Sequence, residues 1–250
     1  MGNSNIGVLG MALLKAREIG KIFGGLKALD NVDFAVQAGE LVGLIGPNGA
    51  GKTTLFNVIT GVYPPSSGQI WFKGEQISCM RPDTICRKGI ARTYQLVRTF
   101  EDLTVLENVL VGRFFGSGDR ASLDIEPTQE VYKLLKFFEI HEEINTLVDN
   151  LTIGERKKVE IARALATHPE LLLLDEVMAG LNPTELERMM EIIKELRKMG
   201  ITIIMIEHQM RAIMNLSDRI IVLHHGVKIA EGTPQDIAKN EAVIEAYLGG

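Results

Sequence analysis

Short, nearly continuous apolar runs dominate the hydrophobic pattern of this chain. Residues 40–45, 171–174 and 201–206 have this character, which is typical of strands buried on both faces of a parallel sheet. Shorter or more alternating segments predict further strands at residues 12–19, 32–36, 69–73, 90–94, 219–223 and 227–231. The pattern therefore indicates a large sheet with a buried centre.

Helical patterns separate these strands. Residues 52–60, 184–199 and 243–248 read as single helices, and residues 104 to about 166 are helical in pattern, with breaks at Pro127 and Asn150. One face of the helix at 184–199 carries apolar side chains that we interpret as core packing, namely Leu186, Met189, Met190, Ile193, Leu196 and Met199. The alternation of strands and helices predicts an α/β fold with right-handed crossovers and a mainly parallel sheet.

Composition narrows the classes of function. A chain of 250 residues can form one large domain or two small ones with a sizeable apolar core. Its net charge of −5 gives no overall electrostatic reason to expect a nucleic-acid partner. Cys79 and Cys86 form no C-x-x-C motif and have no second pair, which argues against a zinc site or a disulfide framework. A reduced, cytosolic setting is the simpler interpretation.

Hydropathy bears on the relation to membranes. Apolar runs stay below the roughly 18 residues that a membrane-spanning helix needs, so any transport role requires separate membrane subunits. Residues 6–14 are apolar but short, and Lys15 and Arg17 follow them directly, which argues against a secretory signal. Met11 is an alternative start, so residues 1–10 are predicted to be a loose extension.

A glycine-rich loop at residues 46–53 follows the predicted strand 40–45 and precedes a predicted helix. The loop fits the pattern G-x-x-x-x-G-K-[ST], in which backbone N–H groups surround phosphates while the lysine and the hydroxyl supply charge and a magnesium ligand. The helix N-terminus adds its positive dipole end to this site. The motif thus predicts binding of ATP with Mg²⁺ through Gly46, Pro47, Asn48, Gly49, Ala50, Gly51, Lys52, Thr53 and Thr54.

An acidic pair, Asp175 and Glu176, directly follows the apolar run 171–174. Ligands of open parallel sheets bind at the carboxyl ends of the strands. We therefore expect Asp175 to hold the Mg²⁺ complex and Glu176 to polarise the water that attacks the γ-phosphate. On its own the pair could equally be solvated acids at a turn, but the upstream phosphate loop favours the catalytic interpretation.

Together these motifs resemble the ATP-binding subunits of ABC transporters, from about residue 13 to residue 249. The resemblance implies that Phe23 stacks on adenine, although an isolated phenylalanine there is more often a core residue. It also implies that Gln95 senses Mg²⁺ and the attacking water, and that His208 hydrogen-bonds the γ-phosphate. His224 and His225 have no such support and are interpreted as a solvated turn.

The segment at residues 151–155 stands where this family usually has L-S-G-G-Q at the start of a helix. Its residues are Leu151, Thr152, Ile153, Gly154 and Glu155. In the family the segment contacts the γ-phosphate bound by the opposite subunit, which implies two subunits arranged head to tail. Ile153 replaces a usual glycine. The plain alternative is a helix capped by Thr152 with Glu155 completing a capping box, and both interpretations can hold at once.

Two further departures are visible beside the acidic pair. Asn182 takes the aspartate position of a loop that usually contains S-A-L-D, so communication between subunits is expected to differ. Val177 stands where a proline commonly follows the acidic pair, a change that we interpret as structural.

The resemblance implies a single ATP-binding domain over residues 11–250. Its fold would be a three-layer phosphate-loop NTPase core with an N-terminal antiparallel β subdomain and an inserted helical subdomain near residues 96–160. Its expected activity is ATP hydrolysis coupled to movement in an integral-membrane permease, at the cytoplasmic face of the membrane. The working unit would contain a second ATPase subunit, either identical or related.

Within the family, residues 91–95, 103–109, 179–183 and 245–249 resemble the subunit that energises import of branched-chain amino acids, with an external substrate-binding protein as indirect partner. The ATPase of lipopolysaccharide export is similar and stays an alternative. A soluble ABC-type ATPase acting on DNA or ribosomes is disfavoured, because there is one ATP domain, no long coiled coil and no basic tail. A nucleotide-gated binding module with negligible turnover is a third alternative, motivated by Ile153 and Asn182.

Overall fold

The computed structural model describes residues 12–95, 99–116 and 126–248. The loose extension expected at residues 1–10 lies outside the described residues. Within them no helix is both long enough and apolar enough to cross a lipid bilayer.

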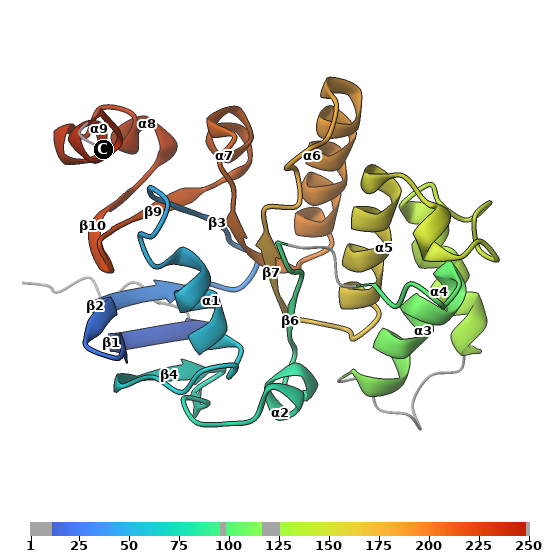
Figure 1. The fold of residues 1–250 in the computed structure, drawn as a ribbon, viewed down its shortest axis with the longest axis horizontal. Helices are drawn as coiled ribbons and strands as arrows, with labels where there is room; N and C mark the ends of the chain where they lie inside the picture. Colours follow the sequence, from blue (N-terminus) through green and yellow to red (C-terminus); the bar gives the residue numbers. More distant parts are fainter. Residues whose placement is uncertain (1–11, 96–98, 117–125, 249–250) are drawn as a thin grey trace, which may run out of the picture.

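A mainly parallel sheet of six strands forms the centre of the molecule (Figure 1). Its strands follow the order β10-β9-β3-β8-β7-β6, and β9, β3, β8, β7 and β6 run parallel to their neighbours whereas β10 is antiparallel. This arrangement agrees with the α/β pattern of the sequence. The strands are β3 (Leu41–Ile45), β6 (Ile90–Arg92), β7 (Leu171–Asp175), β8 (Thr202–Ile206), β9 (Arg219–His224) and β10 (Val227–Gly232).

A second, antiparallel sheet of four strands has the order β2-β1-β4-β5. Its strands are β1 (Leu14–Phe23), β2 (Leu26–Val36), β4 (Ser67–Phe72) and β5 (Glu75–Gln76). The first two are longer than the predictions of 12–19 and 32–36, because the ends that meet at the Gly24-Gly25 turn are exposed and lack an apolar pattern. Both glycines have positive φ, which suits this tight turn.

The helices pack around the parallel sheet, and α3, α4 and α5 lie together beyond its β6 edge (Figure 1). They are α1 (Lys52–Ile59), α2 (Pro82–Arg87), α3 (Val105–Phe115), α4 (Pro127–Phe137), α5 (Ile153–Leu165), α6 (Pro183–Lys198), α7 (Met210–Leu216), α8 (Pro234–Ile237) and α9 (Glu241–Leu248). Pro127 begins α4 because a helix tolerates proline in its first turn, where the missing N–H has no intrahelical partner. The predicted boundary of an inserted subdomain at residue 160 falls inside α5, and that boundary stays a prediction.

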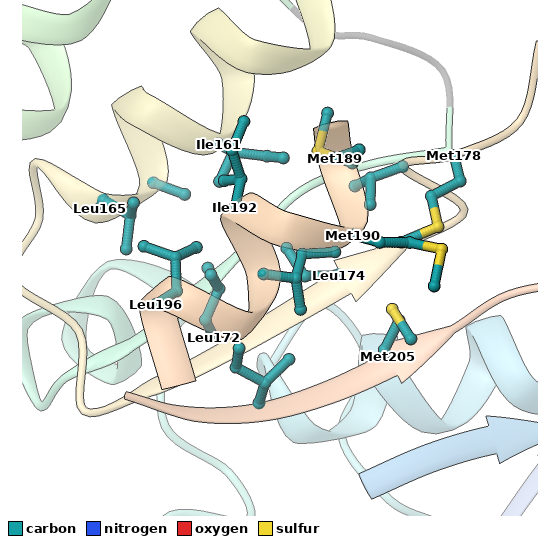
Figure 2. Packing of buried hydrophobic residues seen from close by; sticks show 14 of the residues in the cluster. Ile161, Leu165, Leu172, Leu174, Met178, Met189, Met190, Ile192, Leu196 and Met205 are labelled. Carbon is teal, nitrogen blue, oxygen red and sulfur yellow. The ribbon is translucent and has the colours of Figure 1, made fainter. Parts of the chain in front are cut away.

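Both faces of the parallel sheet are buried, which explains the continuous apolar runs. Leu172 and Leu174 of β7 lie in one cluster with α5 and α6, while Leu171 and Leu173 lie in a second cluster with α1 and the antiparallel sheet. Figure 2 shows the first cluster, where methionines of α6 meet the leucines of β7. Met199 was expected in this core, but it is 66% exposed because α6 ends one residue before it.

We predict that Leu174→Ala destabilises the protein by about 2–5 kcal/mol, because the fully buried side chain would leave a cavity between β7 and α6. Urea unfolding followed by circular dichroism measures the change. Met199→Ala is the matched control and should alter stability by less than about 0.5 kcal/mol, since its side chain is exposed. Equal losses in the two variants would contradict this assignment of the core.

Candidate active site

The glycine-rich loop joins β3 to α1 at the carboxyl edge of the parallel sheet. Gly51 caps α1 in a left-handed conformation, with φ 102°, and a Cβ there would lie 2.6 Å from the carbonyl oxygen of Ala28. A Cβ on Gly46 would lie 2.1 Å from the carbonyl oxygen of Leu223. Only glycine fits these two positions, and the loop therefore exposes backbone N–H groups at a helix N-terminus, an arrangement that binds anions.

The Lys52 ammonium lies inside this loop. Its Nζ donates hydrogen bonds to the carbonyl oxygens of Gly46, at 2.7 Å, and Pro47, at 3.0 Å. Burial lowers the pKa of Lys52, and the negative charges of Glu176 and Asp175 oppose that shift. The cation is therefore held by the loop itself, next to the backbone groups that suit a phosphate.

A cavity of about 590 Å³ opens in front of the loop, within the range of small-molecule sites. It collects eleven of the predicted site residues from both sheets, and His225 lines it as well. The predicted residues are Phe23, Asn48, Gly49, Ala50, Gly51, Lys52, Thr53, Thr54, Gln95, Glu176 and His208. The turn containing His225 thus faces the cavity, which its sequence context did not indicate.

The Glu176 carboxylate lies between two of these side chains. Gln95 donates from Nε2 to Oε2 of Glu176 at 3.0 Å, and His208 Nε2 lies 2.8 Å from Oε1. The direction of the second hydrogen bond depends on which nitrogen of the ring carries the proton. Three residues far apart in the sequence therefore meet at one carboxylate. β6 ends at Arg92 and not at residue 94 as predicted, so Gln95 does not directly follow the strand but lies in the loop beyond it.

The backbone of Glu176 is strained. Its φ of 52° places a non-glycine residue in the left-handed region, a conformation that costs about 1–3 kcal/mol and persists only where neighbouring contacts hold it. The Glu176 N–H donates to the carbonyl oxygen of Ile206 at 2.9 Å, and the Glu176 carbonyl accepts from Lys157 Nζ at 3.1 Å. Such strain is found at sites where a side chain must be aimed.

Asp175, directly before Glu176, is buried and does not line the cavity. Its Oδ2 accepts from Arg92 at 2.7 Å, and its Oδ1 is buried without a hydrogen-bond partner among the described residues. Burial raises the pKa of Asp175 although Arg92 acts in the opposite direction. A buried unpaired carboxylate oxygen suits water bound to Mg²⁺. Arg92 was not predicted as part of this site.

The donor set fits magnesium. Thr53 and Gln95 both line the cavity and offer oxygen atoms, which hard cations prefer. Among the described residues no group of three or more His, Cys, Asp and Glu could hold a metal ion. Mg²⁺ commonly binds through one or two protein side chains, substrate phosphates and water, so this sparse set is sufficient.

The segment Leu151–Glu155 lies apart from the cavity of its own chain. Thr152 caps α5 and forms a reciprocal capping box with Glu155, as the plain interpretation predicted. Ile153 is 60% exposed at the helix start. Asn182 likewise caps α6 and accepts from two backbone N–H groups, so it fills the capping role that an aspartate would fill.

The buried side chains of Glu207 and Lys157 form hydrogen bonds to the main chain at and just after the acidic pair. Glu207, directly before His208, accepts from the Met178 N–H at 2.7 Å. Burial raises the pKa of Glu207 to about 7, although Lys157 and its backbone hydrogen bonds act in the opposite direction. Burial also lowers the pKa of Lys157. Little in the sequence signals these two residues: Glu207 directly follows a predicted buried strand and Lys157 lies within a helical pattern, and neither position distinguishes a buried charge from a solvated one.

Comparison with known proteins agrees with this geometry. Residues 29–179 match the family described as ABC transporter, and residues 227–250 match the one described as branched-chain amino acid ATP-binding cassette transporter. The chain therefore belongs to the ABC transporter ATP-binding family and is an ATP hydrolase.

Particular relatives cover nearly the whole chain. It is 42% identical to the high-affinity branched-chain amino acid transport ATP-binding protein LivG of Escherichia coli strain K12, over 91% of this chain and 94% of that protein. It is 36% identical to the probable LivG of Archaeoglobus fulgidus, over 96% of each.

Solved structures show the same fold. The ADP conformation of MJ1267, an ATP-binding cassette of an ABC transporter, superposes with a TM-score of 0.87 at 33% identity, over 96% of this chain and 100% of that chain. A dimeric structure of the cassette MJ0796 gives a TM-score of 0.80 at 27% identity, over 88% and 98%.

We predict that Lys52→Ala weakens ATP binding about ten- to 100-fold, because it removes charge-assisted hydrogen bonds to phosphate. Titration with a fluorescent ATP analogue measures the affinity. Lys194→Ala, on the exposed face of α6, is the control and should bind as the unmodified chain does. Unchanged affinity in Lys52→Ala would remove Lys52 from the nucleotide site.

The raised pKa of Glu207 predicts a pH-dependent stability. A carboxyl with a folded-state pKa near 7 and an ordinary value of 4.5 stabilises the fold below pH 4.5, and this contribution is lost as pH rises through 7. Relative to Glu207→Gln, the unmodified protein should therefore lose about 3 kcal/mol of unfolding free energy over this interval.

The measurement is urea unfolding at several pH values without nucleotide or magnesium. Glu142→Gln, which alters an exposed carboxylate, is the control and should keep the pH dependence of the unmodified protein. Parallel stability profiles for Glu207→Gln and the unmodified protein would show that Glu207 does not titrate in this way.

Proposed function

We propose that Glu176 polarises the water that hydrolyses ATP in this chain. The observation that carries the proposal is the position of its carboxylate between Gln95 and His208 at the mouth of the phosphate loop. A general base must reach the attacking water and must itself be oriented. Gln95 and His208 provide that orientation, and His208 is exposed enough to reach a γ-phosphate.

The loop and Lys52 bind the triphosphate. Backbone N–H groups of residues 48–54 surround the phosphates, while the Lys52 ammonium exchanges its carbonyl partners for phosphate oxygens. Phe23 stands at the cavity edge, 39% exposed, where its ring can stack on adenine. Phosphoryl transfer depends mainly on such positioning and charge stabilisation.

Thr53, Gln95 and Asp175 would hold Mg²⁺ beside the phosphates. When bound, the ion neutralises charge on the phosphate oxygens. Asp175 would act through Oδ1, the oxygen without a hydrogen-bond partner among the described residues, because Oδ2 accepts from Arg92. Thr53 and Gln95 would offer their side-chain oxygens to the ion from the cavity wall.

A second subunit completes the site. The residues Leu151, Thr152, Ile153, Gly154 and Glu155 do not line the cavity of their own chain, and the exposed start of α5 is free to meet a nucleotide held by another chain. The dimeric structures of the similar cassette MJ0796 support a two-subunit arrangement. We infer that hydrolysis is fast only in the head-to-tail pair.

The transported cargo is proposed to be a branched-chain amino acid. The names of the LivG and BraF relatives and the C-terminal match at residues 227–250 support this choice over lipopolysaccharide export and over a soluble ABC-type ATPase. The partners would be integral-membrane permeases, with an external substrate-binding protein acting through them. The chain would then work at the cytoplasmic face of the membrane.

Glu176→Gln tests the central role. We expect ATP hydrolysis to fall between about 10²- and 10⁴-fold, as for loss of a general base, with ATP affinity retained because the phosphate loop is unchanged. Phosphate release and nucleotide titration measure the two quantities, and uptake of labelled leucine by vesicles that also contain the permeases and the substrate-binding protein measures transport.

Glu170→Gln is the matched control, because Glu170 lies just before the amino end of the same strand β7 and pairs with Lys73 on the surface. It should hydrolyse ATP at the normal rate. A normal rate in Glu176→Gln would defeat the water-activating role. If the unmodified chain hydrolyses ATP normally but the vesicles take up no leucine, the ATPase assignment stands and the proposed cargo is wrong.

A further inference from the structure

Two charged side chains of α5 are buried on the face that packs toward the site. Lys157 is 5% exposed and Glu160 is 2% exposed. They are three residues apart, so they lie on the same side of the helix. Charges this deeply buried need polar partners, and in both cases the partners include main-chain groups next to the proposed catalytic residues.

Lys157 forms hydrogen bonds to the segment that follows β7. Its Nζ donates to the carbonyl oxygen of Glu176 at 3.1 Å and also to that of Ala179. The Met178 N–H between them is held by Glu207 at 2.7 Å. The chain that leaves the acidic pair is therefore fixed by one buried cation from α5 and one buried carboxyl from the end of β8.

The hydrogen bond from Lys157 constrains the strained backbone of Glu176. Glu176 has φ 52°, and both of its peptide groups are hydrogen-bonded, the N–H to Ile206 and the carbonyl to Lys157. A non-glycine residue keeps this conformation only where its surroundings impose it. Without the Lys157 ammonium one of these two backbone constraints is lost, and the direction of the Glu176 side chain is held less firmly, by its hydrogen bonds to Gln95 and His208.

Glu160 holds the main chain next to Gln95, the hydrogen-bond partner of Glu176. Its Oε1 accepts from the Tyr94 N–H at 2.8 Å. Tyr94 directly precedes Gln95, whose amide donates to the Glu176 carboxylate at 3.0 Å. One helix thus anchors the main chain behind both members of this hydrogen bond.

We propose that Lys157 and Glu160 are positioning residues for the hydrolytic site of their own chain, and that α5 aims Glu176 and Gln95 at each other through these main-chain contacts. The proposal rests on the role given to Glu176 under the proposed function. Neither residue lines the cavity in front of the phosphate loop. Because α5 begins with the segment proposed to meet the nucleotide of the second subunit, movement of this helix would act on both sites.

Substitution of Lys157 tests the proposal. Lys157→Met keeps the length of the side chain but removes its hydrogen bonds, and Lys157→Arg restores a cation with several donors. Lys158→Met is the matched control, because Lys158 follows on the same helix and donates no hydrogen bond to residues 176–179 in the described structure. Steady-state hydrolysis gives kcat and KM, analogue titration gives ATP affinity, and thermal melting reports folding.

We expect Lys157→Met to lower kcat about ten- to 100-fold, with KM and ATP affinity changed less than about two-fold, as expected when only transition-state positioning is lost. Lys157→Arg should recover most of kcat, and Lys158→Met should keep it. If Lys157→Met shows no cooperative melting transition, Lys157→Gln makes the same comparison, because it also lacks the cation and its amide is one bond shorter than the lysine side chain.

The proposal is overturned if a folded Lys157→Met or Lys157→Gln variant keeps normal kcat. It is also overturned if kcat and ATP affinity fall together, because a purely structural role would produce that result. Glu176→Gln, measured in parallel, separates the two claims. Loss of activity there with normal kcat in the Lys157 variants rejects this inference alone, whereas normal activity in Glu176→Gln rejects the function on which it rests.

Discussion

The parallel alignment of β3, β8, β7 and β6 is the constraint on which the rest of the site depends. These neighbouring strands end at one edge of the six-stranded sheet, so the residues that follow each of them meet although they are far apart in sequence. The glycine-rich loop follows β3, His208 follows β8, Glu176 follows β7 and Gln95 follows β6. Burial of both sheet faces holds the strands in register, and core stability is in this way linked to the geometry of hydrolysis.

Charges of both signs lie close together behind this edge. Lys52, Arg92 and Lys157 supply cations, while the acidic pair and Glu207 supply carboxyl groups, and most of these groups are buried. Each would be costly to bury alone, and together they offset one another. Among the residues that the structure describes, Lys52 Nζ donates to loop carbonyls that a phosphate can replace, and one oxygen of Asp175 has no hydrogen-bond partner. The site is organised for phosphate before phosphate arrives, which is the condition for electrostatic catalysis.

Much of this arrangement could be predicted from the sequence, because phosphate binding requires small residues, a lysine and a hydroxyl at fixed spacing. The α/β class and the glycine-rich loop followed from such local rules, and eleven of the predicted residues line one cavity. Arg92, Lys157 and Glu207 could not be found in this way, since a buried charge and a solvated charge look alike in one sequence. The exposed ends of β1 and β2 were missed because they lack an apolar pattern, and Met199 was misplaced because helical periodicity does not show where α6 ends. The proposed role of residues 151–155 came from the family resemblance and not from local rules, because this segment does not line the cavity of its own chain.

The central claim is that a nucleotide bound at Lys52 is completed by residues 151–155 of a second chain. A crystal structure of the protein with a non-hydrolysable ATP analogue and magnesium measures this directly. We expect the terminal phosphate within about 3 Å of Lys52 Nζ, Glu176 facing it, and the start of α5 from the other chain on its far side. An empty loop, or a bound nucleotide whose terminal phosphate meets no second chain, would contradict the account.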